Sequence, residues 1–375
     1  MSQNDSVRSE SAAPEFDARR AAPSRRRKLA GRGLLFFGAI LIGSIAAMPA
    51  PYVIERPGPV FNILGDKPDS SLVSISGAKT YPADGNLNLM TVSMVGSPRQ
   101  TPSWFELISA WMDPAQTIVP LEEAFPNGQT AQENEVESQK MMAVSQQDAI
   151  AAALNGLGLD FGRQIYVELV SKSTPASGKL VAGDIVQGVN GKPAATIDEL
   201  RSLIQKSNGS EITIQVSRDG KPLELKLTPF KDDDGAYRMG VLTSYVYDFP
   251  IDVKIKVEDV GGPSGGLMFA LAITELLGQD SLNHGLDISG TGTITPEGQV
   301  GPIGGIQQKM YAAIRAGSKY FLAPAENCPE VVGHVPSGLN VFKVSTLTEA
   351  KQILAKLGSG IDPSTLPTCT AQSTK

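Results

Sequence analysis

The sequence predicts an α/β unit over residues 240–357, preceded by a small strand-rich module and, nearer the N-terminus, by one apolar segment. Three observations lead to this fold class. Strand and helix patterns alternate through the last third of the chain. Residues 163–230 hold two hairpin patterns around one capped helix. Residues 33–53 contain no charged side chain. The chain has 375 residues, of which 41% are hydrophobic and 19% charged, enough for two or three packed domains.

The apolar segment 33–53 follows a basic tail. Residues 1–32 carry eight basic and four acidic side chains, so this tail has a charge of +4 and the remaining chain −10. A negative body argues against nucleic acid as the main partner. Because about 20 apolar residues span a bilayer, we expect a disordered tail over 1–32 and a single transmembrane helix over 33–53. The basic flank then places the N-terminus in the cytoplasm and the body outside. A cleaved signal peptide and a buried core helix are the alternatives.

Residues 54–150 form an anchor-proximal extracytoplasmic region, which we expect to be part of the domain at the end of the chain. Residues 85–96 alternate like a strand, and residues 104–112 favour a short helix. Residues 145–158 favour a helix that a glycine ends.

The strand-rich module is predicted over residues 151–232. Asn190-Gly191 and Asp219-Gly220 lie between apolar runs, a strong hairpin signal. Thr196 and Glu199 form a capping box that opens a helix over 197–207. These elements predict a small, mostly β domain.

Residues 233–358 carry the alternating pattern of the α/β unit. Helices are expected over 263–278, 307–317 and 347–358. Strands are expected over 254–260, 319–324 and 340–346, with a glycine-rich strand pair over 288–306.

The most informative residue of this unit is Ser264, in the stretch "DVGGPSGGLMFALAI". A helix cap would explain the serine but not the four surrounding glycines. The chain has no G-x-x-x-x-G-K-[ST] motif, so ATP binding is not expected. The stretch does fit the G-x-S-x-G elbow of α/β-hydrolases, with Asp287 and His334 available as triad partners.

A lysine base is the other possibility for Ser264. Burial lowers the pKa of a lysine amine and so lets it take a serine proton near neutral pH. Lys309 follows four glycines and precedes the apolar residues of the helix over 307–317. By spacing alone, a solvated helix lysine beside Gln307 and Gln308 is the favoured interpretation of this position.

A family resemblance separates these alternatives. Residues 252–335 resemble the proteolytic domain of Lon proteases, through "GGPSGG", "GTGTITPEGQVGPIGGIQQK" and the following "AAIRAGSKYFLAPAEN". The one departure in the serine motif is Gly265, where alanine is commoner. The resemblance implies that Ser264 is the nucleophile, Lys309 the general base and Thr291 a residue that orients the lysine amine. Gly262 and Gly265 would shape the turn that exposes the serine, and backbone N–H groups there would form an oxyanion hole.

The mostly β module resembles a PDZ domain of the bacterial membrane-protease type, through "TPASGKLVAGDIVQGVNGKP". PDZ domains bind peptides by strand addition and hold a C-terminal carboxylate. Residues 156–161, "GLGLDF", are the candidate carboxylate loop. A packing module that binds nothing is the alternative.

The two cysteines are Cys328 and Cys369, and Cys369 lies in a tail over 359–375 that we expect to be flexible. An oxidising compartment would permit a disulfide between them, and two free thiols are the alternative. Neither a zinc constellation nor a disulfide framework can be built from two cysteines, and we expect no metal and no cofactor.

The whole chain is similar to the PDZ-containing, membrane-anchored Lon-like serine proteases of bacteria. The resemblance implies an ATP-independent endopeptidase of the cell membrane that cleaves extracytoplasmic proteins, with unfolded segments or C-termini as substrates. It also implies a homo-oligomeric ring. The alternatives are an inactive, membrane-tethered peptide-binding scaffold and an esterase that uses Ser264 with His334.

Overall fold

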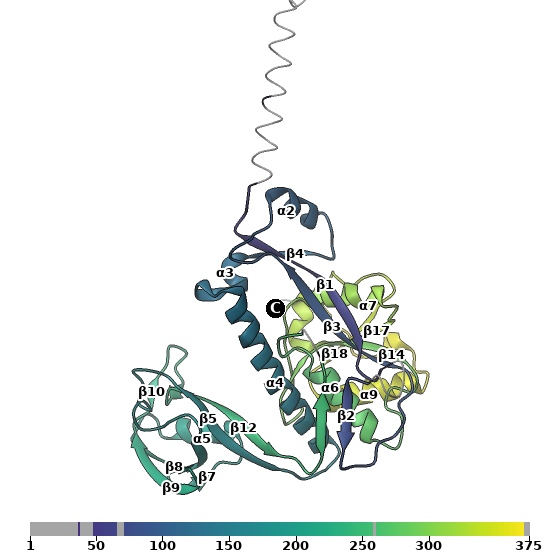
Figure 1. The fold of residues 1–375 in the computed structure, drawn as a ribbon. Coiled ribbons are helices and arrows are strands. Elements are labelled where there is room, and N and C mark those ends of the chain that lie inside the picture. Colours follow the sequence, from purple (N-terminus) through teal and green to yellow (C-terminus); the bar gives the residue numbers. More distant parts are fainter. Residues whose placement is uncertain (1–36, 38–47, 66–70, 258–259, 371–375) are drawn as a thin grey trace, which may run out of the picture.

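The computed structural model describes residues 37, 48–65, 71–257 and 260–370. A six-stranded mixed sheet in it combines strands from residues 52–120 with strands from residues 287–344 (Figure 1). Its strand order is β18-β17-β14-β3-β1-β4. The strands are β1 (Tyr52–Asn62), β3 (Asn86–Val95), β4 (Thr117–Pro120), β14 (Asp287–Gly290), β17 (Tyr320–Pro324) and β18 (Asn340–Val344). Parallel pairing of β3 with β14 connects the anchor-proximal region to the Ser264-bearing unit in one domain.

Helices cover both faces of this sheet. Leu87, Leu89 and Leu322 pack with one helical layer, made of α4 (Ala131–Gly156), α6 (Gly266–Leu277) and α9 (Leu347–Gly358). Met90 and Phe321, neighbours of these leucines along the strands, pack with α7 (Ile306–Arg315) on the opposite face. Because successive strand residues point to opposite faces, apolar residues at adjacent positions give the sheet two cores.

Short elements complete this domain. They are β2 (Val73–Ser76) paired with β13 (Asp252–Ile255), β15 (Thr293–Ile294) paired with β16 (Val300–Gly301), α2 (Trp104–Trp111), α3 (Leu121–Ala124), α8 (Cys328–Val331), and 3₁₀ turns at Pro126–Gly128, Ala325–Asn327 and Pro363–Thr365. The hairpin of β15 and β16 lies between β14 and α7 in the sequence, so it connects the elements on either side of it.

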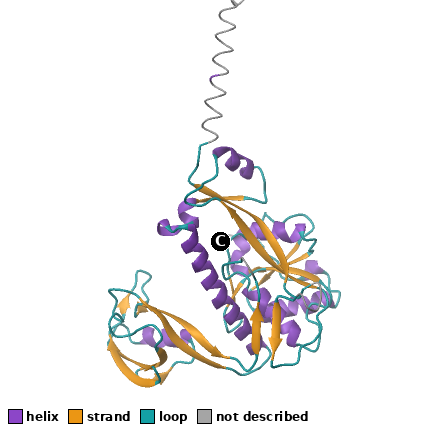
Figure 2. Ribbon diagram, in the orientation of Figure 1, coloured by secondary structure: helices purple, strands orange, loops and turns teal. Residues whose placement is uncertain are grey.

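The strand-rich module is a separate sheet of order β12-β5-β6-β8-β9 with one helix (Figure 2). Its elements are β5 (Gly162–Val170), β6 (Ile185–Val189), β7 (Lys192–Pro193), α5 (Ile197–Lys206), β8 (Ile212–Arg218), β9 (Lys221–Leu227), β10 (Phe230–Lys231), β11 (Tyr237–Arg238) and β12 (Val241–Asp248). The turns at Asn190-Gly191 and Asp219-Gly220 and the capping box of Thr196 are present as predicted.

The boundaries of this module differ from the predicted 151–232. Strand β12, which the sequence analysis placed in the following domain, pairs along its length with β5. The module therefore extends to Asp248. Residues 151–156 instead end α4, where Ala152 and Leu154 pack in the core of the large domain. The capping box of α4 at Thr130 and Glu133 starts this helix well before the predicted 145.

The predicted tail 1–32 and most of the predicted span 33–53 lie outside the described residues. Among the residues that are described, none of the helices is long and apolar enough to cross a membrane. The last two residues of the predicted span, Tyr52 and Val53, belong to β1 and pair with Pro120 and Val119. Val53 is fully buried there, so its place in the domain core explains why an apolar residue stands at this position.

The predicted flexible tail is fastened to the domain through residue 370. Cys328 and Cys369 form a disulfide across 41 positions of sequence. Leu366 packs in the core, and Thr368 bridges Phe342 of β18. The last residues, 371–375, lie outside the described chain.

Replacing both cysteines by serine is expected to lower the free energy of unfolding by about 2–4 kcal/mol, because the cross-link restricts the unfolded chain. Thermal unfolding should show the wild type falling to the level of the Cys328→Ser/Cys369→Ser variant when a reductant is added. The variant itself should not respond to the reductant. Equal stability of both proteins without reductant would show that the bridge contributes nothing.

Candidate active site

Ser264 lies in the turn that leads into α6, and it does not cap that helix. The N-cap position is Gly265, whose missing side chain leaves no capping bond. Gly262 has a φ of 83°, the left-handed region that favours glycine. The turn is held from the side by α4: Gly262 N donates to Ser138 O at 2.8 Å, and Ser145 Oγ donates to Pro263 O at 2.8 Å.

Close packing explains the glycines that follow the serine. A Cβ at Gly265 would lie 2.9 Å from Phe269 Cε2 and 3.0 Å from Leu89 Cδ1. A Cβ at Gly266 would lie 2.9 Å from both Ile294 Cγ2 and Ser145 Oγ. Both glycines therefore let the start of α6 enter the core between the sheet, β15 and α4.

Lys309 reaches Ser264 from α7. Its Nζ donates to Ser264 Oγ at 2.8 Å and to Thr291 Oγ1 at 3.2 Å, and the residue is only 3% exposed. Gly305 starts α7 with a φ of 67°, and a Cβ there would lie 2.6 Å from Val92 Cγ2. This glycine lets the first turn of α7 lie against β3 and so directs Lys309 inward.

The electrostatics of the lysine follow from its burial. Loss of water lowers the pKa of Lys309 to about 7, and the carboxylate of Glu55 on β1 partly opposes this shift. Burial likewise raises the pKa of Glu55, and Lys309 acts to lower it. A substantial fraction of the amine is therefore uncharged at neutral pH, which is the form that accepts a proton.

Thr291 connects the lysine to the serine backbone. This fully buried residue follows β14; its Oγ1 donates to Ser264 O at 2.9 Å and accepts from Lys309 Nζ. Gly292 N also donates to Ser264 O, at 2.8 Å. Ser264, Lys309 and Thr291, distant in sequence, are thus brought into one hydrogen-bonded group.

Two backbone N–H groups beside the hydroxyl have no acceptor within the part of the chain that the structure describes. No described residue accepts a hydrogen bond from the N–H of Ser264 or of Gly265. Both groups stand at the N-terminal end of α6, where the helix dipole favours negative charge.

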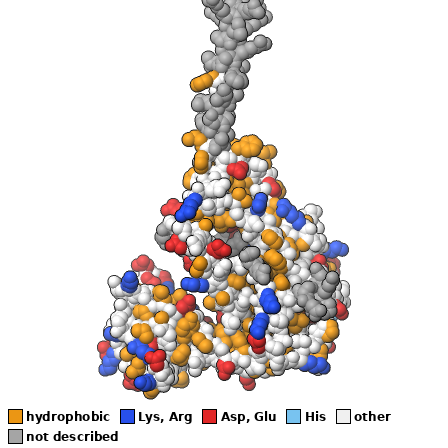
Figure 3. Space-filling model, viewed as in Figure 1, with side chains coloured by type: hydrophobic (Ala, Val, Ile, Leu, Met, Phe, Trp, Pro, Cys, Tyr) orange, Lys and Arg blue, Asp and Glu red, His pale blue; other side chains and the backbone are white. Residues whose placement is uncertain are grey.

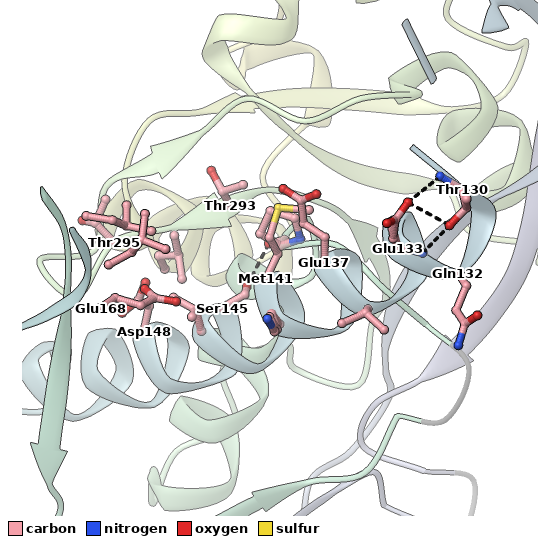
Figure 4. A pocket seen from close by; sticks show the side chains of 17 residues that line it. Thr130, Gln132, Glu133, Glu137, Met141, Ser145, Asp148, Glu168, Thr293 and Thr295 are labelled. Atoms are coloured by element: carbon pink, nitrogen blue, oxygen red, sulfur yellow. Dashed lines mark hydrogen bonds between the residues drawn. The ribbon is translucent and has the colours of Figure 1, made fainter. Parts of the chain in front are cut away.

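A cavity of about 1000 Å³ opens beside the turn. It lies between α4, β15 and the edge of the strand-rich module, and Pro263, Thr293 and Leu242 are among its lining residues. Figure 4 shows Met141, Ser145 and Asp148 on the side of α4 that faces Thr293 and Thr295. Pro263, the residue next to Ser264, thus forms part of the cavity wall.

Neither histidine contributes to the group around Ser264. Asp287 Oδ1 accepts hydrogen bonds from Ser318 Oγ at 3.2 Å and from Asn88 Nδ2. His334 lines a different hollow, which includes Trp111 and Tyr311. The triad through Asp287 and His334 is therefore not assembled. Within the described chain, no group of three or more His, Cys, Asp or Glu side chains is placed to hold a metal ion.

Three further residues contribute to the site without a sequence motif that marks them: Glu55, Ser138 and Ser145. All three come from the region before the PDZ-like module, and they reach the site only through the pairing of β1 with β3 and the packing of α4 on α6. No local motif marks such residues, since their role depends on tertiary structure.

Two family models match the chain. Residues 251–357 match the Lon protease (S16) C-terminal proteolytic domain, and residues 135–228 match the PDZ domain. The Lon protease of Campylobacter concisus is 32% identical over 143 residues, which cover 36% of this chain and 17% of that protein. The Lon protease of Helicobacter pylori is 30% identical over 142 residues, with the same coverage of 36% and 17%. The alignments thus span less than a fifth of these curated relatives.

Among solved structures, the PDZ domain of an SdrC-like protein from Listeria innocua is 24% identical, with a TM-score of 0.21. This match covers 23% of the chain and 99% of the solved domain. The Lon-type match covers the second half of the large α/β domain, and the PDZ match includes most of the strand-rich sheet. The chain therefore contains a Lon-type C-terminal proteolytic domain and a PDZ domain.

Proposed function

We propose that this protein is an ATP-independent serine endopeptidase in which Ser264 is the nucleophile and Lys309 the general base. The observation that carries the proposal is the contact of 2.8 Å between Lys309 Nζ and Ser264 Oγ, made by an amine whose burial lowers its pKa to about 7. The Lon-type match over 251–357 supports the same reaction class.

The reaction follows from this geometry. The uncharged amine of Lys309 takes the proton of Ser264, and Oγ attacks the carbonyl carbon of the substrate peptide. The N–H groups of Ser264 and Gly265 would receive the oxyanion that forms. The Lys309 ammonium then protonates the leaving amine, and the peptide bond breaks to give an acyl-enzyme. Water gives a proton to the same amine and attacks the ester, and the Lys309 ammonium returns that proton to Ser264 Oγ as the acyl group leaves.

Thr291 would orient the amine during these transfers. Because its hydroxyl proton is donated to Ser264 O, a lone pair of Oγ1 faces Lys309 Nζ. Glu55 would stabilise the ammonium that forms after the first transfer.

The PDZ domain would select the substrate through a groove between β12 and α5. Strand β12 is the edge of its sheet, so one side of its backbone is open to an added strand. The groove has a volume of about 700 Å³, and the apolar side chains of Leu200, Ile204 and Met239 line it. At one end, no described residue accepts the N–H of Met239 or Gly240, which suits them to hold a C-terminal carboxylate.

This loop at 237–240 takes the place of the predicted carboxylate loop at 156–161, which contributes no residue to the groove. The groove continues through a hollow of about 410 Å³ that includes Thr243 and Asp148. Thr295 and Asp148 belong both to this hollow and to the cavity beside Ser264. A bound C-terminus would thus direct the preceding residues toward the nucleophile.

We further propose that the protein is anchored in the cell membrane by the apolar segment 33–53, with both domains outside the cytoplasm. The disulfide between Cys328 and Cys369 supports an oxidising compartment.

Replacing either member of the dyad should abolish cleavage. We expect Ser264→Ala and Lys309→Met each to lower the rate of casein hydrolysis without ATP by about 1000-fold or more, because the two groups act as a unit. His334→Ala is the matched control and should retain wild-type activity. Cleavage that survives in Lys309→Met but is lost in His334→Ala would refute the dyad. A wild type that binds casein but never cleaves it would support the inactive scaffold.

The pH dependence of cleavage should report the lysine. With the pKa of Lys309 near 7, kcat/KM should rise with pH through a midpoint near 7 as the amine loses its proton. Glu55→Gln removes the negative charge that favours the ammonium form, so the midpoint should move to lower pH. Glu224→Gln, an exposed change on β9, should leave it unmoved. An unchanged midpoint in Glu55→Gln would show that Glu55 does not act on the amine.

Charge on the groove strand should weaken peptide binding. Leu242 on β12 is 54% exposed and lines the groove, so Leu242→Glu should weaken binding of a short peptide with an apolar last residue and a free carboxylate about tenfold or more. Leu223→Glu alters an exposed leucine of β9, at the opposite edge of the same sheet, and should bind like the parent. Fluorescence anisotropy in the Ser264→Ala background measures both. Equal affinity for the carboxylate and amide forms of the peptide would argue against the loop at 237–240.

A further inference from the structure

The helix α2 (Trp104–Trp111) exposes an unusually apolar face. A surface helix normally buries its apolar residues and exposes polar ones. Here the buried residues are Leu107 and Ala110, but most of the exposed side chains are also large and apolar. We define the α2 face as Trp104, Phe105, Ile108, Trp111 and Met112, which are 42%, 69%, 54%, 81% and 79% exposed.

The α2 face is one continuous stripe. At about 100° per residue, its five positions fall within an arc of about 120°, apart from the buried arc of Leu107 and Ala110. Glu106 and Ser109 lie between the two arcs, and Glu106 is engaged in the capping box of Ser103. The helix thus has two apolar sides, of which the domain covers only one.

The α2 face is fixed rigidly to the body. Leu107 and Ala110 pack on Ala50 and Ile54, and the rings of Trp104 and Tyr52 meet edge to face at 6.2 Å. These contacts fix the orientation of α2, so the side chains of the α2 face point away from the domain.

The position of α2 in the chain indicates what covers it. Trp104 N donates to Met48 O at 3.3 Å, and Pro49 bridges Ser103. The residues immediately before Met48, 33–47, carry no charge in the sequence. Helix α2 therefore lies beside the point where this apolar segment joins the body, at the end of the molecule remote from the PDZ sheet (Figure 1). Hydrophobic side chains gather at this end in Figure 3.

We propose that the α2 face inserts into the interfacial layer of a lipid bilayer. Tryptophan is enriched at membrane–water interfaces, where its ring is amphipathic. Both tryptophans of the chain lie on this face. An apolar stripe beside polar residues is the pattern of helices that lie in the plane of the membrane. The inference rests on the membrane anchoring proposed above and adds to it a second contact, which holds the proteolytic domain against the bilayer in one orientation.

The two tryptophans provide a direct test, since all tryptophan emission of the chain comes from α2. The full chain is reconstituted in vesicles of phosphatidylcholine and phosphatidylglycerol, with either ordinary or brominated acyl chains. We expect brominated lipid to quench most of the emission, and aqueous iodide to quench little of it.

Charge variants on the same helix locate the contact. Ile108→Glu places a carboxylate in the α2 face and should restore both emission in brominated vesicles and access to iodide. Ser109→Glu places the same charge one residue further on, outside the face, and should behave as the wild type. As a further control, the Trp104→Phe/Trp111→Phe/Phe230→Trp variant emits from the PDZ domain and should not respond to brominated lipid.

Flotation and casein cleavage in the same samples separate the outcomes. A chain that floats with the vesicles but whose emission brominated lipid does not quench overturns the α2 contact and leaves the anchor standing. A chain that does not float overturns both. Shielding from iodide that grows with protein concentration and is equal in both lipids would assign the face to a second copy and overturn the proposal. Quenching by brominated lipid without casein cleavage would support the α2 contact and contradict only the proposed protease activity.

Discussion

The site depends on a lysine amine kept away from water. An exposed lysine stays protonated near neutral pH and cannot take a proton from serine. Lys309 lies on α7, and its side chain is buried in the domain. The free-energy cost of a buried charge therefore lowers its pKa. The negative charge of Glu55 acts in the opposite direction and raises the pKa of Lys309. The surrounding fold therefore excludes water from the Lys309 amine while it keeps the amine within hydrogen-bond distance of the Ser264 hydroxyl.

Glycines make the enclosure possible, because each permits a contact that a side chain would prevent. Gly305 lets α7 lie against β3, and Gly265 and Gly266 let α6 begin inside the core. Thr291 then fills the remaining polar position with a hydroxyl that both donates and accepts. The motifs are rich in glycine because Ser264, Lys309 and Thr291 come from three elements that must approach closely.

The sequence predicted the parts of the fold that have local signals. The turns of the PDZ domain, the capping box of Thr196 and the strand and helix order after residue 250 follow from short patterns. The resemblance to Lon proteases named Ser264, Lys309 and Thr291, which lie together in the structure. Strand β12 and the long α4 were misassigned, because pairing with β5 and packing against α6 are contacts between distant residues. Glu55 and Ser145 were missed for the same reason.

Helix α4 connects the two domains at the site itself. Near its middle, Ser138 and Ser145 hold the turn that carries Ser264. One turn later, Asp148 accepts a hydrogen bond from Tyr247 of β12 at 2.8 Å, and burial raises the pKa of this carboxyl to about 6. Arg163 of β5 pairs with Glu297 in the loop after β15, giving the PDZ domain a second attachment. A peptide added to β12, as proposed, would bind a strand fixed to the same helix that holds the Ser264 turn. The groove and the turn of Ser264 thus both contact helix α4, which would give the proposed protease a physical route from recognition to cleavage.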